Sequence, residues 1–315
     1  MSLLAAAQGG NERAFEELVA GHRRELHVHC YRMLGNLADA EDALQETLLT
    51  ARRGIAGFEG RSSLRAWLFL IASHCCMRLA RVRPARVLSW HLARARDPMA
   101  DIGSPVTDTV YLEPWPGEDD AVATRDDVGL ELLAALQHLS PDQRAVLLLR
   151  EVSRFDADEV AAMLDTSPAA VNSALLRARA AVDARVPAHV DPPLPVEQEQ
   201  QVVAAFVDAW ERSDVPGVVG MLGDDVRLTL PPLRAWFDGR DDVAQVVEHR
   251  VLTTPWRLKT VVANQRPALA CYQLVDGTYR LTAVGVLHLQ GDRVRWIALF
   301  LDPPVLARFE LPPTV

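Results

Sequence analysis

Residues 36–83 read NLADAEDALQETLLTARRGIAGFEGRSSLRAWLFLIASHCCMRLARVR, and this stretch predicts the fold of the N-terminal part of the chain. Small and apolar side chains recur at helical spacing in its first half, which predicts a helix whose buried face is formed by Ala40, Ala43, Leu44, Thr47, Leu48 and Ala51. A second stripe of this helix is expected to point outward and holds Asp39, Asp42, Glu46 and Leu49. A glycine-flanked loop over 54–63 then leads into a second helix with an inner stripe formed by Leu64, Leu68, Ile71, Cys75 and Leu79.

Two motifs in this stretch, D-A-E-D-x-x-Q-E-T over 39–47 and F-E-G-R-S-S-L-R-x-W-L-x-x-I-A over 58–72, resemble domain 2 of the extracytoplasmic-function (ECF) sigma-70 factors. The resemblance implies that the acidic helix docks on the clamp helices of core RNA polymerase through Asp39, Asp42, Gln45, Glu46 and Leu49. It also implies that the loop and the second helix melt and read the promoter −10 element, with Phe58, Arg61, Ser62, Ser63, Arg65, Trp67, Ser73 and Arg81 at or near the DNA. The alternative is a generic helical hairpin with solvated charges.

Length and composition limit the class of protein. With 315 residues the chain can form two or three domains, and it has no apolar run long enough to span a membrane. The polar segment after Met1 does not read as a secretion signal, so we expect a cytoplasmic protein without a membrane partner. The four cysteines show no CxxC spacing and are expected to be reduced core thiols.

The net charge of −9 is unevenly distributed along the chain. Residues 1–96 carry 14 arginines and 9 acids, whereas residues 97–127 carry one arginine and 9 acids. Residues 128–186 have a net charge of −2 and residues 187–315 a net charge of −4. Positive charge is therefore concentrated where promoter DNA is expected to bind, as contacts with phosphates require.

Residues 11–34 are expected to form a helix or a helix pair that packs on this hairpin, with Phe15, Leu18, Val19, Leu26, Tyr31 and Leu34 facing inward. His22, His27, His29 and Cys30 lie close together in sequence. Their spacing scatters the side chains around a helix, so no metal site is expected.

From residue 84 to 127 helical periodicity is lost and proline, glycine and acidic residues accumulate, which predicts a linker whose acidic part is 97–127. Within it, an aromatic and proline-rich segment contains Tyr111, Leu112, Pro114 and Trp115. Exposure of its two aromatic side chains to water is unfavourable, so this segment is expected to be covered by a protein surface. The ECF resemblance implies that such a linker threads into the RNA-exit path of the polymerase. A segment that packs on its own protein is an equal alternative.

Residues 128–186 are expected to form four helices, whose starts are indicated by Ser140-Pro141, Asp156 with Glu159, and Ser167-Pro168. The last two helices predict a helix-turn-helix with Val171, Leu175, Ala178 and Val182 inward on its second helix. Residues 139–152 and 165–180 resemble sigma domain 4, which reads the −35 element. The implied DNA contacts are Ser167, Pro168, Ala169, Asn172, Ser173, Leu176, Arg177 and Arg179. Because Asn172 and Ala174 stand where many relatives have basic residues, this helix alone is expected to bind DNA weakly.

A proline-rich hinge over 187–196 precedes a third domain, for which helices followed by a curled antiparallel sheet predict an α+β cone. The patterns A-A-F-x-x-A-W-E-R-x-D-V-P-G-V-V over 204–219 and W-F-D-G-R-D-D-V over 236–243 resemble SnoaL-like domains of the NTF2-like superfamily. The candidate pocket residues are Trp210, Pro231, Trp236, Phe237, His249, Trp256, Tyr272, His288 and Phe300. Asp238 and His249 are the only candidates for acid-base chemistry, and neither catalysis nor a cofactor is expected.

The sequence therefore predicts a multidomain protein: sigma domain 2 (1–96), linker (97–127), sigma domain 4 (128–186), hinge (187–196) and an NTF2-like cone (197–315). Two all-α domains would bind core polymerase and promoter DNA, and the cone would regulate them in cis, with a small-molecule ligand as a possible partner. The competing classes are a helix-turn-helix regulator that acts without polymerase and an enzyme that carries DNA-binding domains. A regulator of that kind has little use for the acidic helix, and an enzyme should show a convergent acid-base pair.

Overall fold

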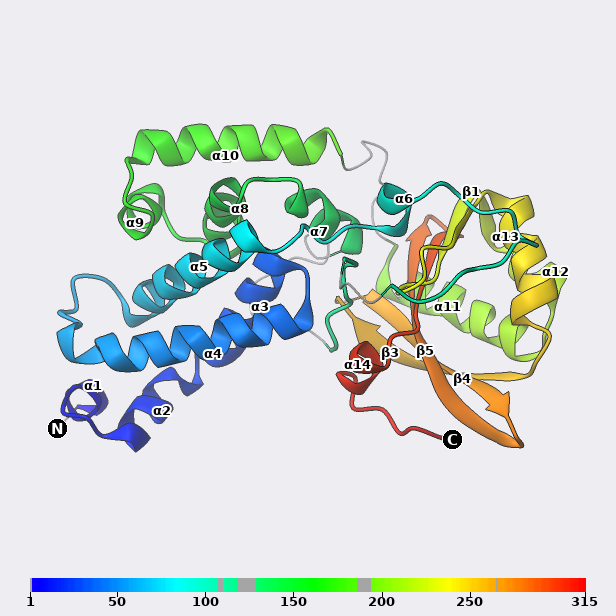
Figure 1. The fold of residues 1–315 in the computed structure, drawn as a ribbon, viewed down its shortest axis with the longest axis horizontal. Coiled ribbons are helices and arrows are strands. Elements are labelled where there is room, and N and C mark those ends of the chain that lie inside the picture. Colours follow the sequence, from blue (N-terminus) through cyan, green and yellow to red (C-terminus); the bar gives the residue numbers. More distant parts are fainter. Residues whose placement is uncertain (1, 107–109, 118–128, 186–193, 265) are drawn as a thin grey trace. The chain divides into compact units, whose positions relative to one another are not determined.

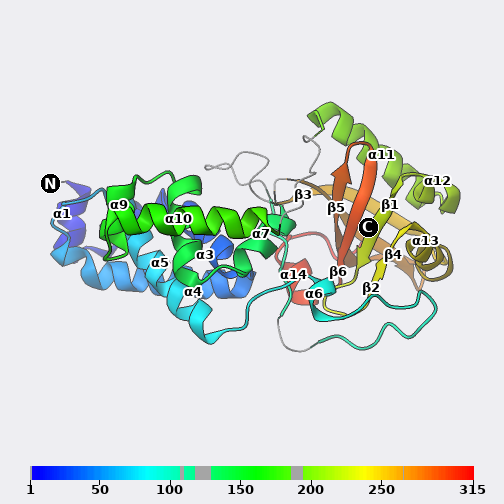
Figure 2. The same cartoon turned by 90° about the horizontal axis from the view of Figure 1, so that it is seen from above.

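The computed structural model describes residues 2–106, 110–117, 129–185, 194–264 and 266–315, which form two compact units (Figures 1 and 2). The first unit includes Met1–Arg86 and Glu131–Pro187, and the second includes Val87–Glu118 and Ala188–Val315. Residues 87–96 thus pack with the second unit, although the sequence pattern assigned them to the first domain. The predicted hinge over 187–196 and the end of the predicted linker lie largely outside the described residues.

The first unit begins with a helical domain over residues 2–86. Its helices are α1 (Leu3–Gln8), α2 (Glu12–Ala20), α3 (Arg23–Leu34), α4 (Leu37–Gly54) and α5 (Leu64–Val82), with a short 3-10 turn at Ile55–Gly57. Local signals set the helix starts, since Asn36 accepts a hydrogen bond from the Asp39 amide at 2.8 Å and Ser63 accepts one from the Ala66 amide at 3.1 Å. The small side chains of α4 are fully buried against α3 and α5, which confirms the predicted inner stripe at Ala40, Ala43, Thr47 and Ala51.

The rest of the first unit is a helix-turn-helix domain, residues 130–185, with α7 (Leu130–Gln137), α8 (Pro141–Leu147), a π-helical turn at Leu148–Val152, α9 (Ala157–Met163) and α10 (Pro168–Asp183). The three predicted starts are confirmed. Ser140 with Gln143 and Asp156 with Glu159 form reciprocal capping boxes, and Ser167 caps α10.

The second unit is an α+β domain (residues 194–315) together with the described residues of 87–117, which we call the docked segment. The helices are α6 (Ser89–Leu92) in the docked segment, then α11 (Val196–Glu211), α12 (Val215–Gly220), α13 (Arg240–Val246) with a π-helical end at Val247–Val251, and α14 (Pro303–Ala307). The strands are β1 (Leu222–Thr229), β2 (Trp236–Asp238), β3 (Trp256–Ala263), β4 (Arg266–Val275), β5 (Thr278–Gln290) and β6 (Arg293–Phe300).

The sheet has the order β2-β1-β6-β5-β4-β3, and its β1–β6 pair is parallel. The expectation of an antiparallel sheet is therefore wrong at this pair. A parallel pair requires a long crossover, which here consists of β2, α13 and three further strands, and no local pattern reveals it. Strand β2 was not predicted because three residues are too few to show an alternation.

One face of this sheet packs on the helices and forms the core of the α+β domain. Its cluster of buried apolar side chains includes Phe206 and Trp210 of α11, Leu228 of β1, Phe237 of β2 and Ile297 of β6. Among the described helices of the whole chain, none combines the length and apolar character that crossing a membrane requires.

Candidate functional site

The outer face of α4 presents acidic side chains around an exposed leucine. The side chains of Asp42 and Glu46 are 64% and 42% exposed, and Leu49 is 49% exposed. Arg83 lies 3.8 Å from Asp42, and Arg78 lies 3.4 Å from Glu46. Ion pairs as exposed as these contribute at most about 1 kcal/mol, so the carboxylates can exchange their partners for the cations of another protein.

Asp39 does not belong to this exposed face, and the prediction that it points outward is wrong. Its side chain is 3% exposed and its carboxylate accepts hydrogen bonds from Arg83 and, at 2.5 Å, from Arg86. Arg86 is itself buried, with 4% of its side chain exposed. Asp39 therefore holds the chain that follows α5 against the start of α4.

The loop before α5 carries four of the eight residues expected at the −10 element. Arg61, Ser62 and Ser63 are exposed, and the rings of Phe58 and Trp67 lie 5.1 Å apart beside them. Exposed hydroxyls, a cation and two partly exposed aromatic rings are the groups that bind single-stranded nucleic acid by phosphate contact and base stacking.

Ser73 differs from its expected position. It is fully buried, and its hydroxyl lies 3.0 Å from Nε2 of His29. Burial lowers the pKa of His29 to about 3, so the imidazole is neutral in this pair. The expectation that Ser73 contacts DNA is wrong for this structure, because α5 turns this position into the core. Among the described residues, no group of three His, Cys, Asp or Glu side chains converges as a metal site would require.

Helix α10 exposes the whole predicted reading face. Val171, Leu175, Ala178 and Val182 are buried, and all eight residues expected at the −35 element are exposed. Leu176 is the most exposed large apolar side chain of this face, at 70%. Arg179 donates a hydrogen bond to Glu151, whereas the exposed Arg177 makes no hydrogen bond or ion pair with another residue that the structure describes. The face offers an amide and a hydroxyl to bases and arginine to phosphates.

The docked segment packs on the α+β domain. Tyr111 donates its hydroxyl to the Leu233 carbonyl at 3.0 Å. The backbone N–H of Trp115 donates to Oδ1 of Asn264, and the backbone N–H of Asn264 donates to the Trp115 carbonyl, both at 3.0 Å. Tyr111, Leu112 and Trp115 are all buried, and burial raises the pKa of Tyr111. The structure thus has the aromatic segment on its own protein, the second of the two alternatives for the linker.

The docked segment also contributes a residue that the sequence did not single out. The ring of Trp90 meets Trp296 edge-on at 5.0 Å and Trp236 at 6.3 Å. Arg227 covers the Trp90 ring at 4.8 Å. The only available signal was a tryptophan in a segment without periodicity, which does not reveal its partners.

The candidate pocket residues do not line one cavity in the part of the chain that the structure describes. Trp210 and Phe237 are members of the core cluster. Trp236, Tyr272 and His288 alternate with core residues along their strands and lie on the opposite face of the sheet. Asp238 pairs with Arg227 and the exposed His249 lies near Glu248, and no hydrogen bond or ion pair between described residues joins Asp238 to His249.

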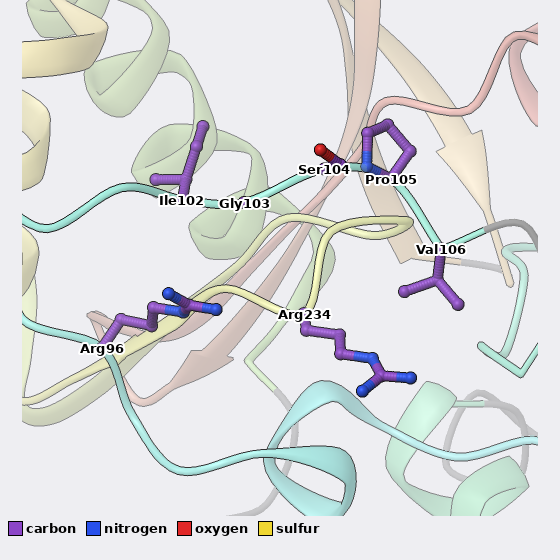
Figure 3. A pocket seen from close by; sticks show the side chains of 7 residues that line it. All are labelled: Arg96, Ile102, Gly103, Ser104, Pro105, Val106 and Arg234. Atoms are coloured by element: carbon purple, nitrogen blue, oxygen red, sulfur yellow. The ribbon is translucent and has the colours of Figure 1, made fainter.

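A pocket of about 340 Å³ lies elsewhere in the second unit, between the docked segment and Arg234 of the α+β domain (Figure 3). Arg96 extends from the docked segment toward the base of Arg234, while the Arg234 side chain extends away from Arg96 toward Val106. None of the predicted pocket residues contributes to its lining.

Comparison with known proteins agrees with the two helical domains of the first unit. The sigma-70 region 2 model matches residues 18–84, and the sigma-70 region 4 model matches residues 129–182. The ECF RNA polymerase sigma factor SigG of Mycobacterium tuberculosis is 37% identical over 306 residues, which cover 92% of this chain and 82% of SigG. The crystal structure of the M. tuberculosis ECF sigma factor SigJ aligns with a TM-score of 0.62 at 22% identity, covering 92% of this chain and 97% of SigJ. An NTF2-like protein of unknown function from Cytophaga hutchinsonii aligns with a TM-score of 0.28 at 16% identity, and the alignment covers 35% of this chain and 94% of that protein.

Two helical domains, one with an acidic outer helix and one with an exposed helix-turn-helix, define a transcription initiation factor of the sigma-70 type. Within that class, the chain belongs to the ECF family of RNA polymerase sigma factors. The predicted fold class and function, promoter-directed initiation by core RNA polymerase, are confirmed. Membership of this family excludes the alternative of a helix-turn-helix regulator that acts without polymerase.

Proposed function

We propose that this sigma factor binds core RNA polymerase through the exposed stripe of α4, formed by Asp42, Gln45, Glu46 and Leu49. The observation that supports it best is that these charged groups and Leu49 are exposed, while their neighbour Asp39 is internally paired. The −10 element would be bound by the α5 region through Phe58, Arg61, Ser62, Ser63, Arg65, Trp67 and Arg81. The −35 element would be bound by the exposed face of α10.

Within α10, we expect Asn172 to read a base and Arg177 to contact phosphate. Asn172→Ala should cost about 1–3 kcal/mol on the native −35 sequence and less on sequences already changed at the base that it reads. Arg177→Ala should weaken binding by a similar factor on every sequence. Transcription from a panel of single-base −35 variants measures both effects, and equal loss for Asn172→Ala on all promoters would contradict direct reading by this residue.

We further propose that the α+β domain regulates the sigma domains by holding the docked segment. Residues 87–129 connect the two helical domains, and a segment of this length reaches about 140 Å when extended. Docking takes residues 87–117 out of this connection, and the remaining residues 118–129 reach only about 40 Å. The −10 and −35 elements are centred about 25 base pairs apart, which is about 85 Å on B-form DNA at 3.4 Å per base pair. A docked segment would therefore restrict simultaneous binding of both elements.

Two altered proteins test this regulation: a chain that ends at Pro187, and Leu112→Ala with Trp115→Ala. Removing these buried side chains should weaken docking by several kcal/mol, since truncation of a buried leucine alone costs about 2–5 kcal/mol. We expect both proteins to give several-fold more promoter-dependent transcription at limiting polymerase. Leu92→Ala is the matched control, because Leu92 lies in the same segment but is 36% exposed. Unchanged promoter-dependent transcription by both altered proteins would show that the α+β domain does not regulate the sigma domains.

A small molecule could act on the same equilibrium through the pocket in Figure 3. Its walls come from the docked segment and from the α+β domain, so a bound ligand would favour the docked state. The shift can be no larger than the difference in ligand affinity between the docked and released states.

A further inference from the structure

Arg65 of α5 is held by the helix-turn-helix domain of the same unit. Its Nη2 donates a hydrogen bond to the carbonyl of Ser153 at 3.1 Å. Its guanidinium carbon lies 4.4 Å from the ring centre of Phe155 and 4.8 Å from that of Phe69 on α5. The Nε of Arg65 donates to both carboxylate oxygens of Glu25, at 3.0 and 3.1 Å. The cation is therefore enclosed by a carboxylate, a carbonyl and two aromatic rings.

Two further contacts join the same domains within the first unit. Asp142, in the first turn of α8, lies 3.1 Å from Arg81 on α5, and both side chains are exposed. Arg144 of α8 is buried and donates a hydrogen bond to the Met33 carbonyl of α3. Phe155, which is 3% exposed, also packs edge-on against Phe69 at 5.2 Å. The contact thus involves both the start and the end of α5.

We propose that the Ser153–Phe155 turn is a lid over the −10 binding surface, and that the lid must leave before single-stranded promoter DNA can use Arg65. The inference rests on the proposed DNA role of α5. A guanidinium offers its donors in one plane and its two faces for stacking. In the closed unit, donors on two of its nitrogens and its contact with aromatic rings are already taken, and a phosphate or a base would have to displace Ser153 and Phe155. Arg81 is likewise paired across the same boundary.

If the lid closes over Arg65, the measured affinity of the protein for single-stranded DNA should be lower than that of the open state. When only a fraction of the protein is open, the apparent Kd for DNA is the intrinsic Kd divided by that fraction. A variant that opens the lid should therefore bind DNA more tightly, even though it adds no contact to DNA.

Asp142→Arg is the variant that tests this, because it places like charge against Arg81 while changing an exposed side chain. Asp158→Arg is its matched control: Asp158 is also exposed and also occupies the second position of its helix, α9, so both variants change the net charge equally. Phe155→Ala is a second opening variant. Opening is measured in the full chain by energy transfer between dyes on Arg53→Cys and Ala162→Cys, which are exposed, whereas the four native cysteines are buried.

DNA binding is measured with a labelled single-stranded 20-mer of random sequence. We expect lower energy transfer and about three- to tenfold tighter binding for Asp142→Arg, with no such change for Asp158→Arg. Adding Arg65→Ala to the opened protein should remove the gain. If Asp142→Arg matches Asp158→Arg in both measurements while Arg65→Ala still weakens binding, the lid is overturned and the DNA role stands. If opening occurs but Arg65→Ala leaves affinity unchanged, the DNA role of Arg65 is overturned, and the lid proposal with it.

Discussion

Core RNA polymerase should no longer bind the variant with Asp42→Arg and Glu46→Arg at concentrations that saturate the unaltered protein. The reversed charges would face the basic clamp-helix surface that the ECF resemblance implies as partner. Like charge across an interface costs several kcal/mol, and a loss of about 3 kcal/mol already weakens Kd by more than 100-fold. Folding should persist, because both side chains are more than 40% exposed and their ion pairs are weak.

A matched control separates a local contact from a general effect of charge. Glu197→Arg with Asp208→Arg makes the same change in net charge on exposed positions of α11. This control should retain polymerase binding in a pull-down or in surface plasmon resonance. Equal binding by the α4 variant and the α11 control would show that the stripe of α4 is not the docking surface.

Asp39→Ala should lower the free energy of unfolding of the first unit by about 3–5 kcal/mol. The substitution leaves the buried Arg86 without its carboxylate partner, and an unpaired charge away from water is far more costly than a missing surface ion pair. Asp42→Ala, one turn further along the same helix, removes an exposed carboxylate and should change stability by less than about 1 kcal/mol.

Pulsed thiol labelling across a urea titration can assign this loss to the right unit. Cys30, Cys75 and Cys76 are buried in the first unit, and Cys271 is buried in the second. The three cysteines of the first unit should react at lower urea in Asp39→Ala, while the midpoint for Cys271 stays the same. A variant as stable as Asp42→Ala would mean that Asp39 and Arg86 are not a buried pair in solution.

The sequence alone was sufficient for features that depend on neighbours along the chain. The helix starts at Ser140, Asp156 and Ser167 were predicted from the sequence, because a capping side chain accepts a hydrogen bond from an amide only three residues away. The exposed face of α10 followed from periodicity, since the residues between its buried positions must face outward. The family itself was recognisable from two short motifs for the same reason, as each lies within one helix or one loop and helix.

Features that depend on distant partners were decided by the tertiary structure. Asp39 lies on an acidic stripe by periodicity, and it is buried only because Arg83 and Arg86, more than forty residues later, return to it. Ser73 lies 44 residues from His29, and Tyr111 bonds a carbonyl 122 residues away. The aromatic residues of the α+β domain were assigned to one pocket because composition does not tell which face of a sheet a strand presents; pairing in the sheet sets that. Arg65 could be predicted as a DNA contact from the sequence. Its cover by Ser153 and Phe155 depends on the packing of two domains, because Ser153 lies 88 residues after Arg65 in the chain, and no local pattern records it.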